Sequence, residues 1–149
     1  MKVAVAYHSY HHGNTKKVLE AIIKLIDVKL IDVSKCKEAS LSQYDLIGFA
    51  SGTYFGKFSD LVVKFAKNNL PDKKPVFLVN TYGLIGASTK EIEKIIADKG
   101  CELLGIYGCR GFDTFGPFKL VGGISKGHPD ENDLRGAVEF FRKIIENQK

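Results

Sequence analysis

Short apolar runs alternate with segments of helical spacing along the whole chain. Continuous apolar runs, typical of strands buried on both faces, predict strands over residues 1–7, 28–33, 45–51, 75–81 and 102–112. Apolar residues recur every three or four positions over residues 15–26, 59–69, 88–99 and 130–147, which predicts helices. The pattern is weakest over residues 34–44, where we expect a short helical turn.

This alternation indicates the class of fold. Strands that alternate with helices form right-handed βαβ units, so we expect an α/β protein with helices on both faces of a five-stranded parallel sheet, a three-layer α/β/α sandwich. A chain of 149 residues without linkers or repeats fits a single domain over residues 1–149. Ligands of such sheets bind beyond the carboxyl ends of the strands, so the loops that follow the strands should hold the chemistry.

The polar turn between the first strand and the first helix is the most informative of these loops. The first N–H groups of a helix lack intrahelical acceptors, and the helix dipole adds partial positive charge there. A strand, a glycine-containing turn and a helix start therefore form an anion site. Asn14 and Thr15 add side-chain donors, and Thr15 also suits a helix start. The sequence thus predicts a phosphate site at Ser9, Tyr10, His11, His12, Gly13, Asn14 and Thr15.

The loops after the third and fourth strands combine glycines with aromatic residues. An aromatic side chain offers a flat face to a planar ring, and glycine lets the backbone approach a ligand closely. Beside a phosphate site, such loops suit a planar heterocycle that carries a phosphate, for which flavin mononucleotide (FMN) is the obvious candidate. The aromatic side chains could instead fold back over the sheet, and Thr53 and Asn80 could simply form turns. The expected ring contacts are Ser51, Gly52, Thr53, Tyr54, Phe55, Gly56, Asn80, Thr81, Tyr82 and Gly83.

These features together resemble the flavodoxin family over nearly the full chain. The resemblance rests on the order of elements, on Gly13-Asn14-Thr15 and on the glycine-rich aromatic loops. The strings at residues 11–15, 53–57 and 126–134 are similar to a flavodoxin-like subgroup of anaerobic bacteria and archaea. The resemblance implies the sheet order 2-1-3-4-5, non-covalent FMN and the role of a short-chain electron carrier. Tyr10 and His12 stand where the family usually has hydroxyl residues, and the chain has no tryptophan to stack on a flavin.

The net charge of +5 changes the expected partners. Typical flavodoxins are strongly acidic, so the redox partners of this chain would be proteins with acidic surfaces. The lysines are dispersed over predicted helix surfaces without an arginine-rich stripe, so we do not expect a nucleic-acid partner. No apolar stretch is long enough to span a bilayer. We expect a cytoplasmic protein without a membrane partner, as a monomer or weak homodimer.

Histidines, cysteines and one long loop leave alternatives open. The histidines could donate hydrogen bonds to a phosphate or have only a structural role; they are His8, His11, His12 and His128. We expect no metal site, because no acidic residue or cysteine lies among the first three histidines. The three cysteines form no Cys-x-x-Cys pair, which favours reduced thiols. Residues 113–129 exceed ordinary connections, so Phe115 and Phe118 could shield a cofactor or bind a partner, unless the loop is disordered.

Other functions on this class of fold are less consistent with the sequence. A phosphorelay receiver needs a phosphoacceptor aspartate where Ser51 stands, and a small tyrosine phosphatase needs a cysteine in the first loop. An NAD(P)H-dependent FMN reductase of quinones or similar acceptors, and a flavin-free binding module, remain as alternatives to the carrier. We assign no catalytic residue.

Overall fold

The computed structural model describes residues 1–10 and 12–149 and has one large parallel sheet at its centre. Its strands are β1 (Val3–His8), β2 (Val28–Asp32), β3 (Leu46–Ser51), β6 (Pro75–Tyr82) and β7 (Glu102–Arg110). They lie in the order β2-β1-β3-β6-β7, and every pair of neighbours is parallel. Counted along the chain this is the order 2-1-3-4-5, so the predicted sheet is confirmed.

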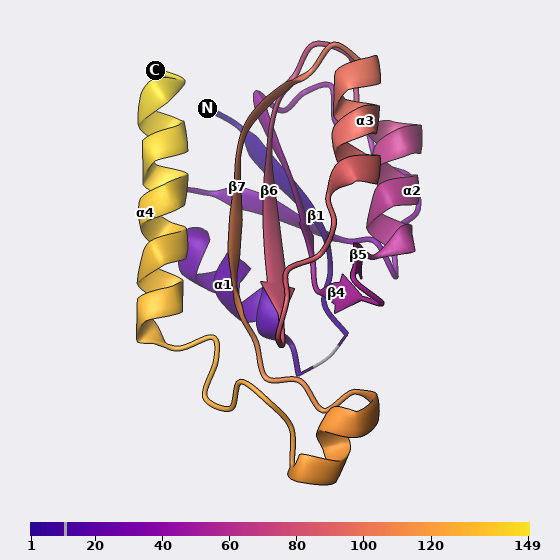
Figure 1. Cartoon of the computed structure of the whole chain (residues 1–149). Coiled ribbons are helices and arrows are strands. Elements are labelled where there is room, and N and C mark those ends of the chain that lie inside the picture. The colour runs from indigo at the N-terminus through magenta and orange to yellow at the C-terminus, as the bar shows by residue number, and fades with distance from the viewer. Residues whose placement is uncertain (11) are drawn as a thin grey trace.

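Four helices complete the three layers. They are α1 (Asn14–Ile22), α2 (Asp60–Asn69), α3 (Lys90–Asp98) and α4 (Glu131–Asn147). Helices α1 and α4 cover one face of the sheet, and α2 and α3 cover the other (Figure 1). Both termini lie near the amino ends of the central strands, away from the end that holds the long loop before α4 (Figure 1). Within the described part of the chain, no helix combines the length and apolar character that a bilayer crossing requires.

The apolar core follows the alternation of side chains along the strands. On β6, Val76 and Leu78 pack with α2 and α3, whereas Phe77 and Val79 pack with α1 and α4. All four side chains are fully buried, as expected for a strand covered on both faces. Gly48 on β3 lies against the Phe77 ring, where any Cβ would overlap it.

One predicted helix is shorter in the structure, and the weakest segment forms the turn that was expected. The helix expected over residues 15–26 ends at Ile22, and turns follow it. Ile23, Leu25 and Ile26 still pack against the core, so their apolar spacing continues where the helix has already ended. The weak segment over residues 34–44 forms turns, and one helical turn is closed by Cys36 N–H donating to Asp32 O at 3.0 Å.

Two short elements within the loops had no counterpart in the sequence prediction. A hairpin of β4 (Thr53–Tyr54) and β5 (Lys57–Phe58) follows β3. A 3-10 helix, η1 (Gly116–Val121), lies inside the long loop after β7 and projects beyond the carboxyl edge of the sheet (Figure 1). Both elements shape the surroundings of the candidate site.

Candidate functional site at the carboxyl edge of the sheet

A polar cavity of about 30 Å³ lies where the carboxyl ends of β1, β3, β6 and β7 meet. Ten of the predicted site residues line it, together with three residues that follow β7. The lining residues are Ser9, Tyr10, Asn14, Thr15, Gly52, Thr53, Tyr54, Thr81, Tyr82, Gly83, Gly111, Phe112 and Asp113. The predicted loops therefore do converge at one edge of the sheet.

A buried polar group joins the start of α1 to the sheet beside this cavity. The hydroxyl oxygens of Thr15 and Thr81 lie 2.8 Å apart in a hydrogen bond, and both side chains are buried. Asn14 Nδ2 donates to the carbonyl of Phe112 at 2.9 Å. Asn14 Oδ1 is buried and has no hydrogen-bond partner among the described residues. A buried acceptor of this kind is costly unless a donor reaches it, so Asn14 is suited to a ligand hydroxyl.

The start of α1 is electrostatically suited to an anion. The helix begins at Asn14 with Gly13 as its N-cap at φ 65°, so the predicted start at Thr15 is wrong by one residue. Gly13 offers no side-chain cap, and the first turn holds Lys16 and Lys17 but no acidic residue. The dipole and both ammonium groups therefore add positive potential beside the cavity. Ser9 Oγ accepts from Lys16 N–H at 3.1 Å and partly caps the helix.

Two histidines, one at the end of β1 and one in the loop after it, form hydrogen bonds with side chains of the protein. His8 Nδ1 lies 2.8 Å from Ser59 Oγ, and its ring stacks on Tyr54 with centroids 5.2 Å apart. His12 Nε2 lies 3.0 Å from Thr114 Oγ1, which joins the first loop to the segment after β7. His11 lies outside the described residues, so its predicted role stays a prediction.

Tyr54 stands between the polar cavity and a second, apolar pocket. Its hydroxyl accepts from Tyr10 N–H at 3.3 Å, which narrows the polar cavity. Burial raises the pKa of the Tyr54 phenol, an effect that the Tyr10 N–H partly offsets. A neutral phenol is consistent with its place against the ring of His8.

The apolar pocket has a volume of about 260 Å³, close to the lower end of ordinary small-molecule sites at roughly 300 Å³. Thr53, Tyr54, Gly83 and Asp113 line both spaces, so the two pockets adjoin. The remaining lining residues are Phe55, Gly56, Leu84, Ile85, Phe115 and Phe118. The site therefore changes from polar to apolar along its length.

Asn80 and Thr53 hold the two ring-side loops in place. Asn80 Nδ2 donates to Ser51 O at 3.0 Å, and Asn80 Oδ1 accepts from Ala87 N–H at 3.0 Å. Thr53 Oγ1 donates to Thr81 O at 2.9 Å. Ser51 Oγ accepts from the N–H of Ser59 at 2.8 Å. These bonds support the turn-forming alternative for Asn80 and Thr53, and ligand contact by them stays a prediction.

Several lining residues were missing from the sequence-based set. Leu84 and Ile85 are exposed apolar residues between two glycines of a strand-end loop, where polar residues are usual, and that anomaly could have identified them. Phe115 and Phe118, expected to shield a cofactor or bind a partner, line the apolar pocket. Asp113 could not have been found from local sequence, because its position depends on close packing against Gly83.

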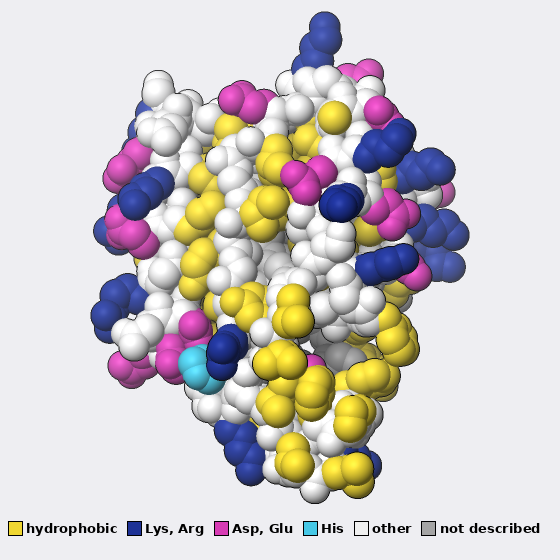
Figure 2. Space-filling view, viewed as in Figure 1, with side chains coloured by type: hydrophobic (Ala, Val, Ile, Leu, Met, Phe, Trp, Pro, Cys, Tyr) yellow, Lys and Arg dark blue, Asp and Glu magenta, His cyan; other side chains and the backbone are white. Residues whose placement is uncertain are grey.

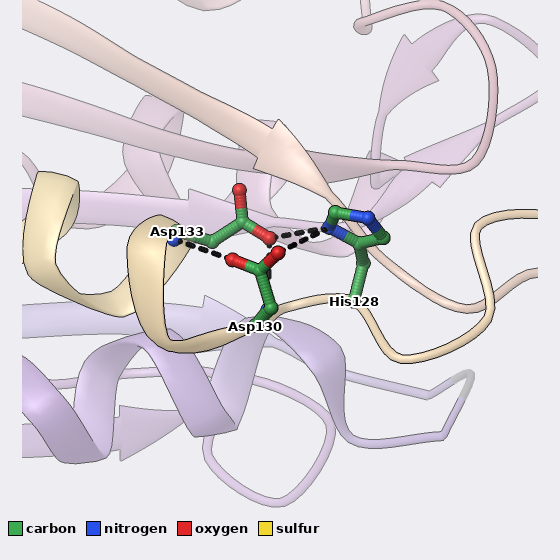
Figure 3. A group of neighbouring side chains, drawn as sticks. All are labelled: His128, Asp130 and Asp133. Atoms are coloured by element: carbon green, nitrogen blue, oxygen red, sulfur yellow. Dashed lines mark hydrogen bonds and ion pairs between the residues drawn. The ribbon is translucent and has the colours of Figure 1, made fainter.

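A third group of polar side chains lies apart, at the start of α4. His128 Nδ1 lies 2.6 Å from Asp133 Oδ2 and 3.7 Å from Asp130 Oδ2 (Figure 3). Asp130 Oδ1 accepts from Asp133 N–H at 2.9 Å, and Asp133 Oδ2 accepts from Asp130 N–H at 2.8 Å. The three could reach one metal ion, but the backbone bonds make Asp130 and Asp133 a capping box for α4, with His128 bonded to Asp133. These bonds fix the segment before α4 against the start of the helix.

The comparisons with known proteins agree with this geometry. A flavodoxin domain model matches residues 4–102. An uncharacterized protein of Methanocaldococcus jannaschii is 37% identical over 150 residues, which are 99% of this chain and 100% of that protein.

Solved structures match the fold at low sequence identity. The FMN-bound flavodoxin of Fusobacterium nucleatum has a TM-score of 0.70 at 15% identity, with all of both chains covered. Rubredoxin oxygen:oxidoreductase from Desulfovibrio gigas has a TM-score of 0.74 at 18% identity and covers 99% of this chain, but only 36% of its own length is matched. With a family model over most of the chain and the flavodoxin sheet order, the chain belongs to the flavodoxin domain family.

Proposed function

We propose that this protein binds FMN non-covalently and carries electrons between partner proteins. The observation that carries the proposal is that the polar cavity and the apolar pocket adjoin at the carboxyl edge of the sheet and share four lining residues. FMN is polar at its ribityl phosphate and flat and largely apolar at its ring, so its two halves match the two halves of this site. The FMN in the related F. nucleatum structure is consistent with the assignment.

The residues at each end fit the two halves of the cofactor. The positive potential at the start of α1 suits the phosphate, and Asn14 Oδ1 would accept a hydrogen bond from a ribityl hydroxyl. Tyr54, Phe55 and Phe115 offer aromatic faces to the ring. At about 30 Å³ the polar cavity is small for a ribityl phosphate, so Tyr54 has to move outward when the cofactor enters.

The flavin would supply the transfer of electrons, whereas the chain would bind and shield it. The aromatic side chains exclude water from the ring, and the hydrogen bonds of Asn80 and Thr53 keep the two ring-side loops at a fixed separation. A site with exposed apolar side chains at its edge suits a carrier, which needs contact with partners more than a binding site for a second substrate.

A visible absorbance spectrum of the purified protein, repeated after FMN is added and the excess removed, tests the proposal. Stoichiometric flavin bands support it, and a colourless protein that retains no flavin contradicts it and favours the flavin-free binding module. Adding NADPH to the loaded protein then separates two redox functions. Slow or no bleaching favours the carrier, whereas rapid bleaching favours the NAD(P)H-dependent reductase.

A further inference from the structure

Exposed apolar side chains gather at the edge of the sheet that holds the candidate site. The described chain has ten large hydrophobic side chains that are exposed, and most of them lie in the strand-end loops. Figure 2 shows hydrophobic side chains, in yellow, gathered over the projecting end of the molecule. We call this surface the apolar rim and define it by Phe55, Leu84, Ile85, Phe115, Leu120 and Val121. Contiguous apolar surface of this kind marks sites of interaction.

Phe55 stands at the tip of the β4–β5 hairpin in a backbone conformation that bulky residues avoid. Its φ is 51°, a left-handed value that asparagine or glycine adopts far more readily. Its side chain is 87% exposed, and its ring meets the Phe115 ring edge-on with centroids 5.3 Å apart. An aromatic residue at this position costs backbone strain and buries little surface, which points to a role outside folding.

Positive charge gathers around the same edge of the sheet, counted over its loops together with the first turn of α1, the first residue of α3 and the last residue of β7. Residues 9–17, 52–59, 83–90 and 110–127 hold seven lysines and arginines but only one acidic residue, Asp113. Their net charge is therefore +6, and that of the rest of the chain is −1. The acidic residues in the first turns of α2, α3 and α4 follow these loops and lie on the helices.

Three lysines lie directly beside the apolar rim. Lys57 is two residues from Phe55 in the hairpin, and Lys119 precedes Leu120 in η1. The side chain of Lys126 lies beside Gly122, because the Lys126 Nζ is 3.4 Å from the position that a Cβ on residue 122 would take. All three are exposed. Dark blue cationic side chains accordingly border the yellow cluster (Figure 2).

We propose that the apolar rim and its lysines form a docking surface for an acidic redox protein. This inference rests on the proposed function and names the class of its partner. An apolar patch of the partner would pack on Phe55 and Phe115, and carboxylates around that patch would face Lys57, Lys119 and Lys126. A second copy of this chain is a poor occupant, because it would bring another +6 group of loops against the first.

The test measures binding to two small electron carriers of opposite charge. A plant-type [2Fe–2S] ferredoxin serves as the acidic probe and cytochrome c as the basic probe, at low and at high ionic strength. We expect the acidic probe to bind more tightly, and its affinity to fall as salt is added. Equal binding of both probes, or no salt-dependent binding of the acidic probe, overturns the proposal.

Two sets of variants locate the surface. The triple variant Lys57→Glu, Lys119→Glu and Lys126→Glu should weaken ferredoxin binding roughly tenfold or more. The matched control Lys29→Glu, Lys64→Glu and Lys143→Glu makes the same change in net charge at exposed positions elsewhere and should have little effect. Equal losses in both triple variants would mean that net charge alone attracts the probe, which contradicts a docking surface.

Phe55→Asn tests the apolar part of the surface. Asparagine tolerates positive φ, so the hairpin should hold while the exposed ring is lost. We expect weaker binding of ferredoxin and an unchanged melting temperature of the flavin-free protein, and unchanged binding would contradict the role of Phe55. Flavin content, read from absorbance on the same samples, separates loss of docking from loss of cofactor.

Two other kinds of binding partner would give different experimental results, and either result overturns the proposal. Binding to phosphatidylserine-containing vesicles but not to phosphatidylcholine vesicles, lost in the first triple variant, would indicate an anionic membrane surface. Concentration-dependent dimerization that disappears in Phe55→Asn would indicate a second copy of the chain.

Discussion

The hydroxyl groups of Thr15 and Thr81 form a buried hydrogen bond of 2.8 Å between the first turn of α1 and the last residues of β6. The two residues are far apart in the sequence, and their contact sets where the start of α1 lies against the sheet. The bond therefore positions Asn14, the neighbour that lines the polar cavity.

Valine substitutions test this bond. Thr15→Val or Thr81→Val leaves one buried hydroxyl without its partner and should lower the free energy of unfolding by about 1–3 kcal/mol. The double variant Thr15→Val and Thr81→Val removes both hydroxyls. We therefore expect its loss of unfolding free energy to be much smaller than the sum of the losses in the two single variants. Chemical denaturation of all four proteins measures the cycle, and additive losses would show that the two hydroxyls do not interact.

Lys16 and Lys17 should favour FMN over riboflavin, which has the same ring but no phosphate. Replacing both by glutamine removes two positive charges from the first turn of α1, and an exposed charge pair of this kind contributes about 0.2–1 kcal/mol. We expect FMN affinity to fall several-fold and riboflavin affinity to stay unchanged, measured by flavin fluorescence titration at low salt. Lys24→Gln with Lys29→Gln is the control, and equal losses for both flavins would place the phosphate elsewhere.

The sequence predicts the sheet well because its strands carry unambiguous apolar runs and all but the second are followed by a helical pattern. It predicts the end of α1 poorly, because Ile23, Leu25 and Ile26 remain buried against the core after the helix has ended. The polar half of the site follows from the glycine-containing turn after β1. Half of the apolar pocket's lining follows from the glycine-rich aromatic loops, but its closure by the contact between Phe115 and Phe55 depends on tertiary packing, which no local pattern encodes.

Cys109 should resist thiol reagents in the folded protein. Burial raises the pKa of its thiol to about 12, with smaller contributions from Asp133 and Asp130. At pH 8 the reactive thiolate is then only about one ten-thousandth of the population, and the side chain is also shielded. We expect Ellman's reagent to label at most Cys36 and Cys101 in native protein and all three cysteines in denaturant. Cys109→Ser should leave the native count unchanged, and a decrease would contradict the prediction.

Asp130 should make the stability of the protein depend on pH in the acidic range. The N–H of Asp133, and then the charge of His128, lower the pKa of Asp130 in the folded state. A carboxyl group with a lowered folded-state pKa stabilises the protein above its unfolded value of about 3.9, and this contribution is lost as pH falls through the folded value.

Asp130→Asn tests this dependence because asparagine mimics the protonated acid and still caps the helix. We expect its melting temperature to lie below that of the wild type at pH 7, since the charged hydrogen bond and the favourable interaction with the helix dipole are lost. The difference should close below about pH 4, as the wild-type carboxyl group becomes protonated. Asp72→Asn, at an exposed turn before β6, is the matched control and should show no such convergence. A difference for Asp130→Asn that stays constant down to pH 2 would mean that the charge of Asp130 does not stabilise α4.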